Sequence, residues 1–599
     1  GVLNGAGAPV PVNTAAAWAD RTDRYQGYAL ATRLHIPILY GVDAVHGHGN
    51  VYGATLFPHN IGLGATRDPH HAERAAQVTA VELRATGMHW AYAPAVTVAR
   101  DERWGRFYES FGELPGLSAE MGEAAIRGYQ GSDLSSPTSV LACAKHFAGD
   151  GGTVWGTGRD GKIDQGDAIV DEAAFRTLHL APYSNAVNAG VATVMASYSS
   201  WNGVRMHSHT GLLTGVLKGD MGFDGFVVSD WGGVFMIDPG NNEGLETMTA
   251  INAGIDMVMV PDNYRGFLGH LEYAVSNGNI SVSRLDDAVR RILTAKFKLG
   301  LFERPFAERS LLARFGSAEH RAAARAAVRD SLVVLKNDGD LLPLPKDLAR
   351  VHVAGKNADN LGYQCGGWTI SWQGGSGDTT VGTTIYEAIT QSVAGACQVT
   401  FSADGSGATG ATVGIVVVGE TPYAEFVGDS ASISLSTQDV AALQNVKAAG
   451  VPTVLVLVTG RPLDLAPHLS NCDAVVVAWL PGTEGGGVAD VLFGDHYPSG
   501  RLSQSWPRSL AQVPINVGDL PYDPLYPWDD RLGLDPQVRF GGDPGERLIA
   551  WKDGATGFAL QSCTNLDGLA AWTNVPAAPV RTGGTYQVAL PASDDTRFY

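Results

Sequence analysis

The sequence predicts an α/β protein that contains a (β/α)8-type barrel, then an α/β sandwich domain, then a small β-rich C-terminal segment. A chain of 599 residues exceeds what one hydrophobic core usually supports, so several domains are expected. Short apolar runs alternate with amphipathic helical stretches through the first 300 residues. These runs also end in side chains suited to chemistry, which favours a barrel over an open sheet.

Six apolar runs in the first part of the chain have the length and composition of buried strands. They span residues 36–45, 89–98, 140–147, 193–200, 225–231 and 255–261. Helical patterns span residues 69–86, 117–130, 171–189 and 282–298. Nearly continuous apolar strands separated by helices predict a parallel sheet that is covered by helices. Six such strands within residues 1–305 favour a barrel rather than a small doubly wound sheet.

Charged and aromatic side chains follow the predicted strands of this first domain. They are Asp43, Arg106, Lys145, His146, Tyr198, Asp230 and Trp231. In a barrel the carboxyl ends of the strands converge on one bowl, whereas in an open sheet they spread along an edge. The barrel therefore predicts that these side chains share a site.

The second half of the chain predicts a linker and a layered domain. The pattern turns irregular over residues 306–325, and a helix predicted over 319–335 opens the second domain, 326–535. Its predicted strands are 351–355, 412–419, 452–460 and 474–482, with helices near 436–449 and 484–494. After these, short strand-like runs between turn residues predict that residues 536–599 are part of an accessory β module.

Composition excludes several classes of partner. A net charge of −19, without any basic run, argues against nucleic acid, and no apolar run is long enough to span a bilayer. The five cysteines are scattered without CxxC spacing, so neither a zinc site nor a disulfide framework is expected. His46 and His48 suggest a metal, but nothing nearby completes a ligand set, so no metal is expected. The chain opens at Gly1 with no visible leader, which could have been removed.

Two stretches hold the carboxylates best suited to catalysis. In "GFVVSDWGG", Asp230 stands at the mouth of a buried strand beside Trp231. An isolated aspartate could instead cap a helix or close a turn, but a carboxylate beside an aromatic ring suits attack on a sugar anomeric carbon. In "VVVGETPYAEFVGDS", Glu420 and Glu425 both follow a buried strand of the second domain.

The chain resembles glycoside hydrolase family 3, in its exo-β-glucanase/β-glucosidase branch, over roughly residues 1–530. The motifs that carry this resemblance include "GVDAVHGHGNVYGATLFPHN", "RDERWGRFYES", "AKHFAGDGGT", "VMASYSSWNG", "CGGWTISWQG" and "GTEGGGVADVLFGD". The resemblance implies a barrel followed by an α/β sandwich with the active site between them. It also implies a retaining mechanism through a covalent glycosyl-enzyme, without a cofactor.

The resemblance also implies a role for each site residue. Asp230 matches the nucleophile, Glu425 matches the acid/base, and Glu420 would be structural. The residues that match a sugar-binding subsite −1 are Asp43, Arg106, Lys145, His146, Met195 and Tyr198. Trp231 and Trp368 match two aromatic walls around the next sugar.

Electrostatics supports different roles for the two carboxylates. Because positive charge favours the charged form, the lysine and arginines around Asp230 are expected to keep it anionic. Glu425 arrives on a loop near tryptophans, where partial desolvation is expected to raise its pKa.

Two departures from the family bear on the branch. Asp150 stands where the N-acetylglucosaminidase branch has a histidine, so that branch is not indicated. Ala99 and Phe107 stand where plant-type members carry cysteines, so no disulfide is expected to hold that loop.

The function predicted is a retaining exo-acting β-glucosidase that releases terminal glucose from short β-glucans and cello-oligosaccharides. Alternatives are a β-xylosidase or mixed-specificity β-glycosidase, a non-catalytic carbohydrate-binding protein, and a metal-dependent hydrolase that uses His46 and His48. The expected partner is a β-glucoside or oligosaccharide, with no nucleic acid, no membrane and no cofactor. The sequence leaves open whether the protein forms a homodimer, and the expected location is secreted or periplasmic.

Overall fold

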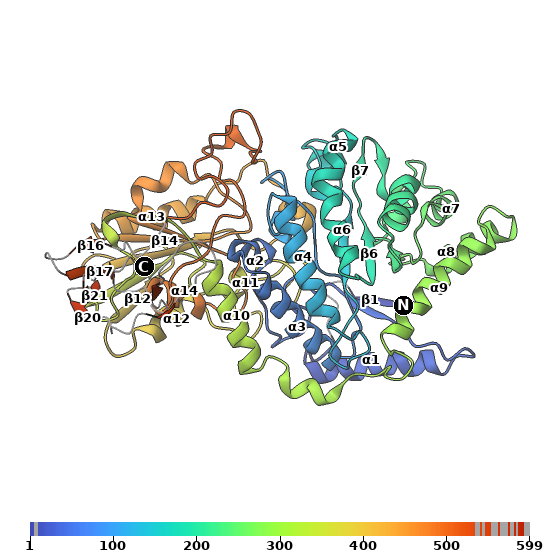
Figure 1. Cartoon of the computed structure of the whole chain (residues 1–599), viewed down its shortest axis with the longest axis horizontal. Helices are drawn as coiled ribbons and strands as arrows, with labels where there is room; N and C mark the ends of the chain where they lie inside the picture. Colours follow the sequence, from blue (N-terminus) through green and yellow to red (C-terminus); the bar gives the residue numbers. More distant parts are fainter. Residues whose placement is uncertain are drawn as a thin grey trace.

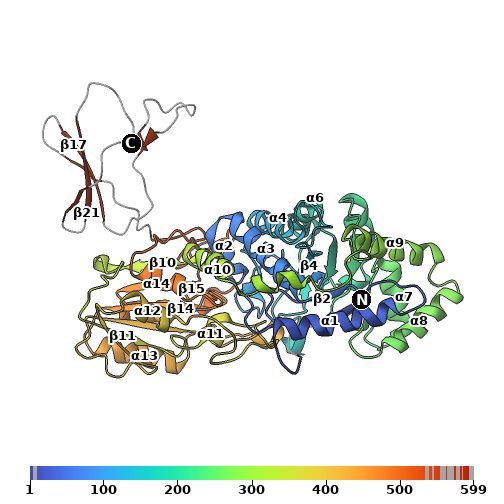
Figure 2. The ribbon, with the colours of Figure 1, turned by 90° about the horizontal axis from the view of Figure 1, so that it is seen from below.

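The chain forms two packed α/β domains and a separate set of C-terminal strands. The computed structural model describes residues 1–4 and 10–532, together with six strands between 539 and 591. The helices of the first domain, from α1 (Ala15–Leu30) to α9 (Val282–Lys298), lie along one half of the molecule, and the second-domain sheet occupies the other half (Figures 1 and 2).

Parallel strands form the centre of the first domain. One sheet has the order β1-β2-β3 and another the order β4-β6-β9. Parallel bridges from Trp90 to Leu141 and from Ala95 to Lys145 link the two sheets, and a bridge from Val228 to Met257 extends the series. The strands are β1 (Val2–Asn4), β2 (Tyr40–Val42), β3 (Trp90–Ala91), β4 (Cys143–Phe147), β6 (Thr193–Ala196) and β9 (Phe226–Val228).

One predicted strand of the central sheets is absent, and one of their observed strands was not predicted. The run at 255–261 makes only the bridge at Met257 and no strand. The start of the chain, which has no strand pattern, forms β1 and pairs in parallel with β2. A three-residue strand is too short to show the period of two by which strands are predicted.

The predicted helices of the first domain are present. They are α3 (Pro69–Ala85), α4 (Pro115–Gln130), α9, and a run that joins α5 (Glu172–Phe175), a π-helical segment (Arg176–Leu180) and α6 (Ala181–Asn188). Helix α1, which buries Trp18, Ala19, Thr22 and Gln26, was not predicted. Helices α7 (Glu243–Ala253) and α8 (Tyr264–Ser276) were also missed.

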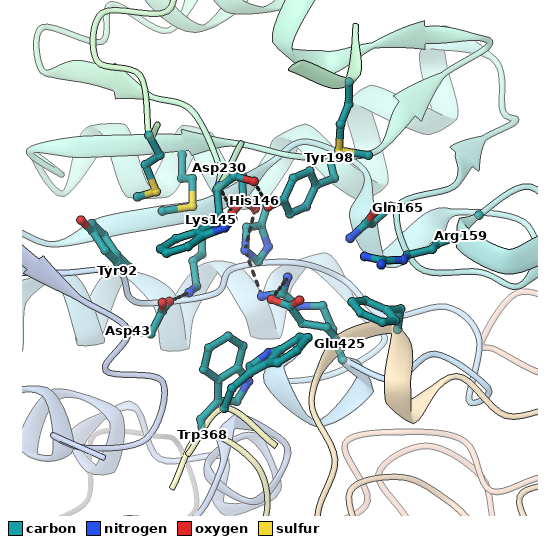
Figure 3. A pocket seen from close by; sticks show the side chains of 18 of the residues that line it. Asp43, Tyr92, Lys145, His146, Arg159, Gln165, Tyr198, Asp230, Trp368 and Glu425 are labelled. Atoms are coloured by element: carbon teal, nitrogen blue, oxygen red, sulfur yellow. Dashed lines mark hydrogen bonds and ion pairs between the residues drawn. The ribbon is translucent and has the colours of Figure 1, made fainter. Parts of the chain in front are cut away.

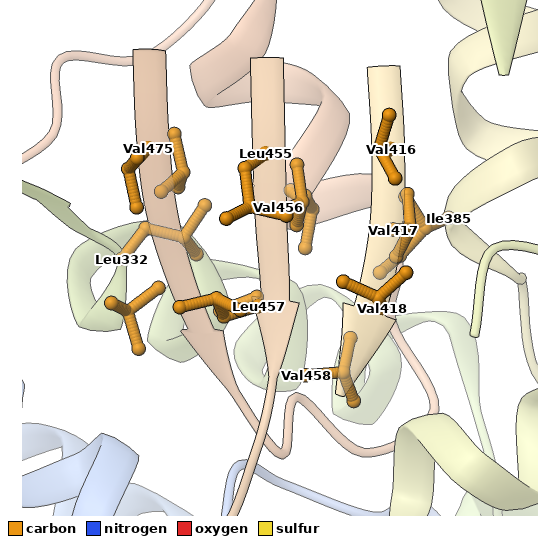
Figure 4. Packing of buried hydrophobic residues seen from close by; sticks show 14 of the residues in the cluster. Leu332, Ile385, Val416, Val417, Val418, Leu455, Val456, Leu457, Val458 and Val475 are labelled. Atoms are coloured by element: carbon orange, nitrogen blue, oxygen red, sulfur yellow. The ribbon is translucent and has the colours of Figure 1, made fainter. Parts of the chain in front are cut away.

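The second domain is a six-stranded sheet of order β10-β15-β14-β13-β11-β12. Every pair is parallel except β10 with β15. The strands are β10 (Val333–Asn337), β11 (Arg350–Ala354), β12 (Gln398–Ser402), β13 (Val413–Gly419), β14 (Thr453–Val458) and β15 (Ala474–Trp479). The three central strands are buried along their whole length, with valine and leucine side chains packed between them (Figure 4).

The helix predicted over 319–335 is shorter in the structure. Helix α10 (Ala318–Ser331) begins inside the stretch predicted as linker and ends before the valine pair at 333–334. Those valines start β10, which pairs antiparallel with β15. β-branched side chains fit a pleated sheet better than a helix, so the sheet ends the helix here.

The two domains share one hydrophobic core. Trp104, Phe107 and Tyr108 of the first domain belong to the same buried cluster as β13, β14 and β15. Because the core crosses the boundary, the loop after β13 is held against the carboxyl ends of the first-domain strands. That loop contains a 3₁₀ turn, Glu425–Gly428, which positions the site described below.

The C-terminal strands form an antiparallel sheet of order β16-β17-β21-β20 and a separate pair, β18-β19. They span Arg539–Gly541, Glu546–Lys552, Thr585–Pro591, Val580–Thr582, Gln561–Ser562 and Thr573–Asn574. The other residues of the predicted β-rich segment, Cys563 included, lie outside the described residues. Within the described part of the chain, no helix combines the length and apolar character needed to cross a bilayer.

Candidate active site

One pocket of about 760 Å³ opens between the two domains, where the carboxyl ends of β2, β4, β6 and β9 face the loop after β13 (Figure 3). All ten site residues predicted from the sequence line this pocket. They are Asp43, Arg106, Lys145, His146, Met195, Tyr198, Asp230, Trp231, Trp368 and Glu425. The sequence therefore predicted side chains that the structure brings together from both domains.

Asp43 and Lys145 form an ion pair on one side of the pocket. Asp43 directly follows β2, Lys145 lies on β4, and Nζ of Lys145 donates to Oδ1 of Asp43 at 2.7 Å. Burial opposes the charge on Lys145, but Asp43 and Glu109 outweigh it and raise the pKa of the lysine. The lysine therefore stays cationic.

Arg106 is the central cation of the pocket and is 4% exposed. It contacts Glu109 through two hydrogen bonds of 3.0 and 2.9 Å, and its Nη2 lies 3.0 Å from Nε2 of His146. Its Nη1 also approaches Oε1 of Glu425 at 3.4 Å. A planar guanidinium suits several acceptors at once, so Arg106 connects the first-domain charges to Glu425.

Asp230 follows β9 and points one free carboxylate oxygen toward the pocket (Figure 3). Its backbone N–H donates to Nε2 of His207 at 3.0 Å, and its Oδ1 accepts the backbone N–H of Trp231 at 2.7 Å. Among the described residues, Oδ2 has no hydrogen-bond partner, and Nε2 of His146 lies 3.7 Å from it. A buried unsatisfied oxygen is costly, which is typical of a group kept for chemistry.

Burial raises the pKa of Asp230 to about 6, against the lowering effect of Arg106, the Trp231 N–H and Lys145. The expectation that positive neighbours dominate is therefore corrected, because desolvation is the larger effect here. At neutral pH, a carboxyl with a pKa of about 6 is still roughly 90% ionised. Asp230 therefore remains mostly ionised at neutral pH, but its pKa lies closer to 7 than expected.

Glu425 is the first residue of the 3₁₀ turn in the second domain. Burial raises its pKa to about 8; Arg106 opposes this shift, and Asp164, Asp230 and Glu109 add to it. Its φ of 53° lies in the left-handed region, which costs a non-glycine residue on the order of 1 kcal/mol. Glu425 is therefore mostly protonated at neutral pH and held in a backbone conformation that the surrounding contacts must enforce.

Glu420, the other candidate glutamate, is fully occupied elsewhere. Its carboxylate accepts from Tyr423, Thr459, the Gly460 backbone and Arg461, each at 2.9 Å. It does not line the pocket. Within the described structure, only Glu425 of this pair faces the site.

The predicted aromatic and hydrophobic residues differ in depth. Trp231 is 48% exposed, and the hydroxyl of Tyr198 donates to its carbonyl oxygen. Trp368 is 6% exposed and donates its indole N–H to Glu109 at 3.0 Å, with Arg106 and Lys145 against its ring. Met195 lies at the end of β6. Trp368 therefore lies deep in the pocket, and Trp231 is nearer the opening.

Sequence reasoning missed several residues of the outer pocket. Trp372 and Phe426 have ring centroids 5.6 Å apart, and Cζ of Arg159 lies 3.7 Å from the centre of the Phe426 ring. Gln165 and Arg205, which sequence reasoning also missed, line the same pocket. Trp372 stands in the same "CGGWTISWQG" motif as Trp368, and Phe426 follows Glu425, so these two had a signal. Arg159 lies on an irregular loop that had none.

His46 and His48 do not line the pocket. His46 donates from Nδ1 to the Phe57 carbonyl oxygen and stacks on His59, and Nε2 of His48 hydrogen-bonds to the Thr86 hydroxyl. Burial lowers the pKa of His46 to about 4 and that of His48 to about 3. In the described part of the chain, no group of three or more histidine, cysteine or acidic side chains is arranged to hold a metal ion.

Together, the pocket holds a free carboxylate, a protonated carboxyl, fixed cations and aromatic rings. Sugars have apolar faces and polar edges, which fit rings combined with hydrogen-bonding groups. An ionised and a protonated carboxyl that line one pocket match the pair that a glycoside hydrolase uses.

The chain belongs to glycosyl hydrolase family 3, as the resemblance of its motifs predicted. The family's N-terminal domain matches residues 1–295 and its C-terminal domain matches residues 332–534. These matches also support a two-domain α/β architecture.

Individual relatives are informative about the activity. The chain is 36% identical to a lysosomal beta glucosidase of Dictyostelium discoideum over 80% of its own length and 62% of the relative's. It is 32% identical to a beta-xylosidase of Formosa agariphila over 82% and 71% of the two lengths. A crystal structure of a mutant exo-1,3/1,4-beta-glucanase from a Pseudoalteromonas species is 42% identical, with a TM-score of 0.83 and 88% of both chains covered. The chain thus spans less than two thirds of the Dictyostelium protein.

Proposed function

We propose that the protein is a retaining, exo-acting β-glucosidase that releases terminal non-reducing β-D-glucose from short β-glucans and cello-oligosaccharides. The observation that carries this proposal is the pair Asp230 and Glu425, which line one pocket with pKa values of about 6 and about 8. One carboxyl is therefore mostly ionised and the other mostly protonated near neutral pH. The names of the Dictyostelium relative and the Pseudoalteromonas structure support glucoside substrates.

In the first step, the free Oδ2 of Asp230 attacks the anomeric carbon of the terminal sugar. The bond from that carbon to the leaving oxygen breaks, and the leaving oxygen takes the proton of Glu425. In the second step, Glu425 accepts a proton from water, whose oxygen displaces Asp230 from the anomeric carbon. Both carboxyl groups return to their initial state, so no cofactor takes part.

The remaining residues would hold the terminal sugar. We assign Asp43, Arg106, Lys145, His146, Met195 and Tyr198 to subsite −1. A charge-paired floor of this kind offers fixed donors and acceptors for hydroxyl groups without the cost of rearranging them during the reaction. Trp231 and Trp368 are assigned to aromatic walls, and we add Trp372 to the walls because it stands at the outer end of the pocket beside Phe426.

The proposed architecture behind this site is a (β/α)8-type barrel over residues 1–305, a linker over 306–325 and an α/β sandwich over 326–535. The parallel order of β1, β2, β3, β4, β6 and β9 supports the barrel. Residues 536–599 would belong to an accessory β module, which the antiparallel strands between 539 and 591 support.

The stereochemistry of the product tests the mechanism. Proton NMR during hydrolysis of nitrophenyl β-glucoside should show the β anomer of glucose first, because two inversions at the anomeric carbon retain its configuration. A 2-fluoroglucoside with a good leaving group should label the enzyme, and peptide mapping should place the label on Asp230. Initial formation of the α anomer, or a label elsewhere, would overturn the proposal.

A β-xylosidase or mixed-specificity enzyme is the second candidate, favoured by the Formosa agariphila relative. The two sugars differ by the hydroxymethyl group, so subsite −1 alone decides between them. Rates on nitrophenyl β-glucoside and β-xyloside separate the two functions. Rates on cellobiose, laminaribiose and gentiobiose then give the linkage preference.

A further inference from the structure

Asp429, just after the turn that carries Glu425, joins the two domains beside the pocket. It is 4% exposed. Its Oδ1 accepts the backbone N–H of Gly105 at 2.8 Å, and its Oδ2 accepts those of Asp164 and Ile163 at 2.8 and 3.3 Å. The donors come from two separate first-domain loops, so one second-domain carboxylate ties both loops together.

Each of the three segments joined at Asp429 also lines the site. Gly105 directly precedes Arg106, the central cation. The loop that contains Ile163 and Asp164 supplies Thr157, Gly158, Arg159 and Gln165 to the pocket lining. The second-domain turn supplies Glu425 and Phe426. The position of Asp429 therefore fixes how the proton donor faces the rest of the pocket.

Gly105 shows how tightly these segments meet. A Cβ atom at this position would lie 1.9 Å from the carbonyl oxygen of Glu425 and 2.8 Å from the backbone of Gly428 and Asp429. Only glycine leaves room for this backbone-to-backbone contact. A further bond, from the Ser430 N–H to the Arg103 carbonyl at 3.0 Å, continues the same contact.

The second-domain turn is also held from behind by Arg461, which is buried. Its Nη2 donates to the Gly428 carbonyl at 2.7 Å and its Nη1 to the Glu102 carbonyl of the first domain at 3.1 Å. The turn is thus fixed on the second-domain side by an arginine and on the first-domain side by Asp429. Fixation from both sides explains how the left-handed φ of Glu425 is maintained.

Asp164 gives the junction an electrostatic consequence. Its side chain is buried and accepts the Trp104 indole N–H at 2.9 Å, while its second oxygen has no partner among the described residues. The charged groups that act on Glu425 are Arg106, Asp164, Asp230 and Glu109, and of the three carboxylates Asp164 contributes most to raising the glutamate's pKa. Burial raises the pKa of Asp164 itself to about 7, so this carboxyl is partly ionised at neutral pH. Because Asp429 accepts the backbone N–H of Asp164, it also holds this carboxyl near Glu425.

We propose that Asp429 is a positioning residue for the proton donor: it fixes the Glu425 turn and the 157–165 loop in their positions relative to Arg106. The proposal rests on the proposed acid/base role of Glu425. It predicts that loss of the Asp429 carboxylate slows proton donation by Glu425. Nucleophilic attack by Asp230 should change little.

The test compares two glucosides in the full chain carrying Asp429→Ala. Cellobiose needs a proton on its leaving oxygen, whereas dinitrophenyl β-glucoside does not. We expect kcat/KM for cellobiose to fall about 100-fold, the scale of a small misplacement, and that for the dinitrophenyl substrate to fall less than about threefold. The basic limb of the cellobiose pH profile should move below about 8, because Glu425 becomes better solvated and Asp164 moves away.

Asp473→Ala is the matched control. Its carboxylate also accepts a backbone N–H, from Thr453 at 2.8 Å, but at the opposite end of β14 from the site. This variant should keep both substrate rates and the basic limb. Equal losses on the two substrates with Asp429→Ala, or no loss on either, would overturn the proposal.

Two further variants keep the test informative if Asp429→Ala does not fold. Asp429→Asn keeps one acceptor but turns an amide toward the other N–H donors, so a smaller loss of the same kind is expected. Gly105→Ala displaces the turn from the first-domain side and should give the same dependence on leaving group. If Glu425→Gln itself shows no such dependence, the proposed function fails; if only the Asp429 and Gly105 variants lack it, the positioning role fails.

Discussion

Lys145 and Asp43 meet at the carboxyl ends of two first-domain strands, β4 and β2, whereas Glu425 reaches the same pocket from a turn of the other domain. The first-domain residues stand where strands of a parallel sheet end, so the sheet itself fixes their positions. Their charges are paired before any substrate arrives. The sugar-holding half of the pocket is therefore organised by the fold.

The positions of the second-domain residues of the pocket depend instead on how the two domains pack together. Glu425 and Trp368 both have φ in the left-handed region, at 53° and 61°. Their fixed contacts cross the domain boundary, from Arg106 to Glu425 and from the Trp368 indole to Glu109. Misplaced docking would leave subsite −1 intact and remove proton transfer. The comparison thus predicts that variants in the two halves fail in different ways.

The largest effect is expected from Asp230→Ala in the strand-end half. Without the attacking carboxylate, kcat/KM should fall about 10⁴-fold or more on every substrate, whatever its leaving group. Steady-state rates on cellobiose and dinitrophenyl β-glucoside measure this. Asp224→Ala is the control, because Asp224 is exposed and contacts only Lys298 in the described structure. Near-normal hydrolysis by the Asp230 variant would mean that another group attacks the sugar.

Glu425→Gln in the docked half should behave differently. Removal of the general acid should lower kcat/KM for cellobiose about 10³-fold and spare dinitrophenyl β-glucoside. Azide should raise kcat on the activated substrate, because it replaces the water that Glu425 would activate. Glu420→Gln should lower the melting temperature, since Arg461 loses its charged partner in a buried site, without any dependence on leaving group. If the two glutamine variants exchange these behaviours, Glu420 is the acid.

The pH profile of kcat/KM should have an acid limb set by Asp230 of the first domain and a basic limb set by Glu425 of the second domain. As pH falls below about 6, Asp230 gains a proton and the rate should drop tenfold per unit. As pH rises above about 8, Glu425 loses its proton and the rate should drop again. Because the two carboxyl groups interact, the apparent pKa values of the two limbs belong to the pair rather than to either residue. The variant Glu425→Gln, measured with an activated substrate, should therefore lack the basic limb. An acid limb near 4 would show that the cations outweigh burial at Asp230.

These two halves also differ in how far the sequence predicts them. Asp43, Lys145 and Asp230 were predicted from strand ends alone, because carboxyl ends of parallel strands converge. The choice of Glu425 over Glu420 came from the family resemblance. The four hydrogen bonds that occupy Glu420 join it mostly to residues distant in the sequence, so no local pattern shows them.

Other properties of the site depend on the folded environment. The sequence indicated positive charge near Asp230, but it did not show how deeply the carboxyl is buried, and burial decides the direction of its pKa shift. Phe426 and Arg159 were missed because loops from different domains form that wall. Helix α10 was predicted too long, because a valine pair fits either a buried helix or a strand until β15 is placed beside it.

The smallest effect is expected at the outer wall, where Trp372 meets Phe426. Loss of one stacking ring is worth about 1 kcal/mol, so Trp372→Ala should lower kcat/KM for cellobiose roughly fivefold to tenfold. Methyl β-glucoside has no second sugar to stack, so its rate should change little. Trp155→Ala is the control, because Trp155 lies against Arg103 outside the pocket. Equal losses on cellobiose and methyl β-glucoside would place Trp372 at the terminal sugar and move the boundary between the two halves outward.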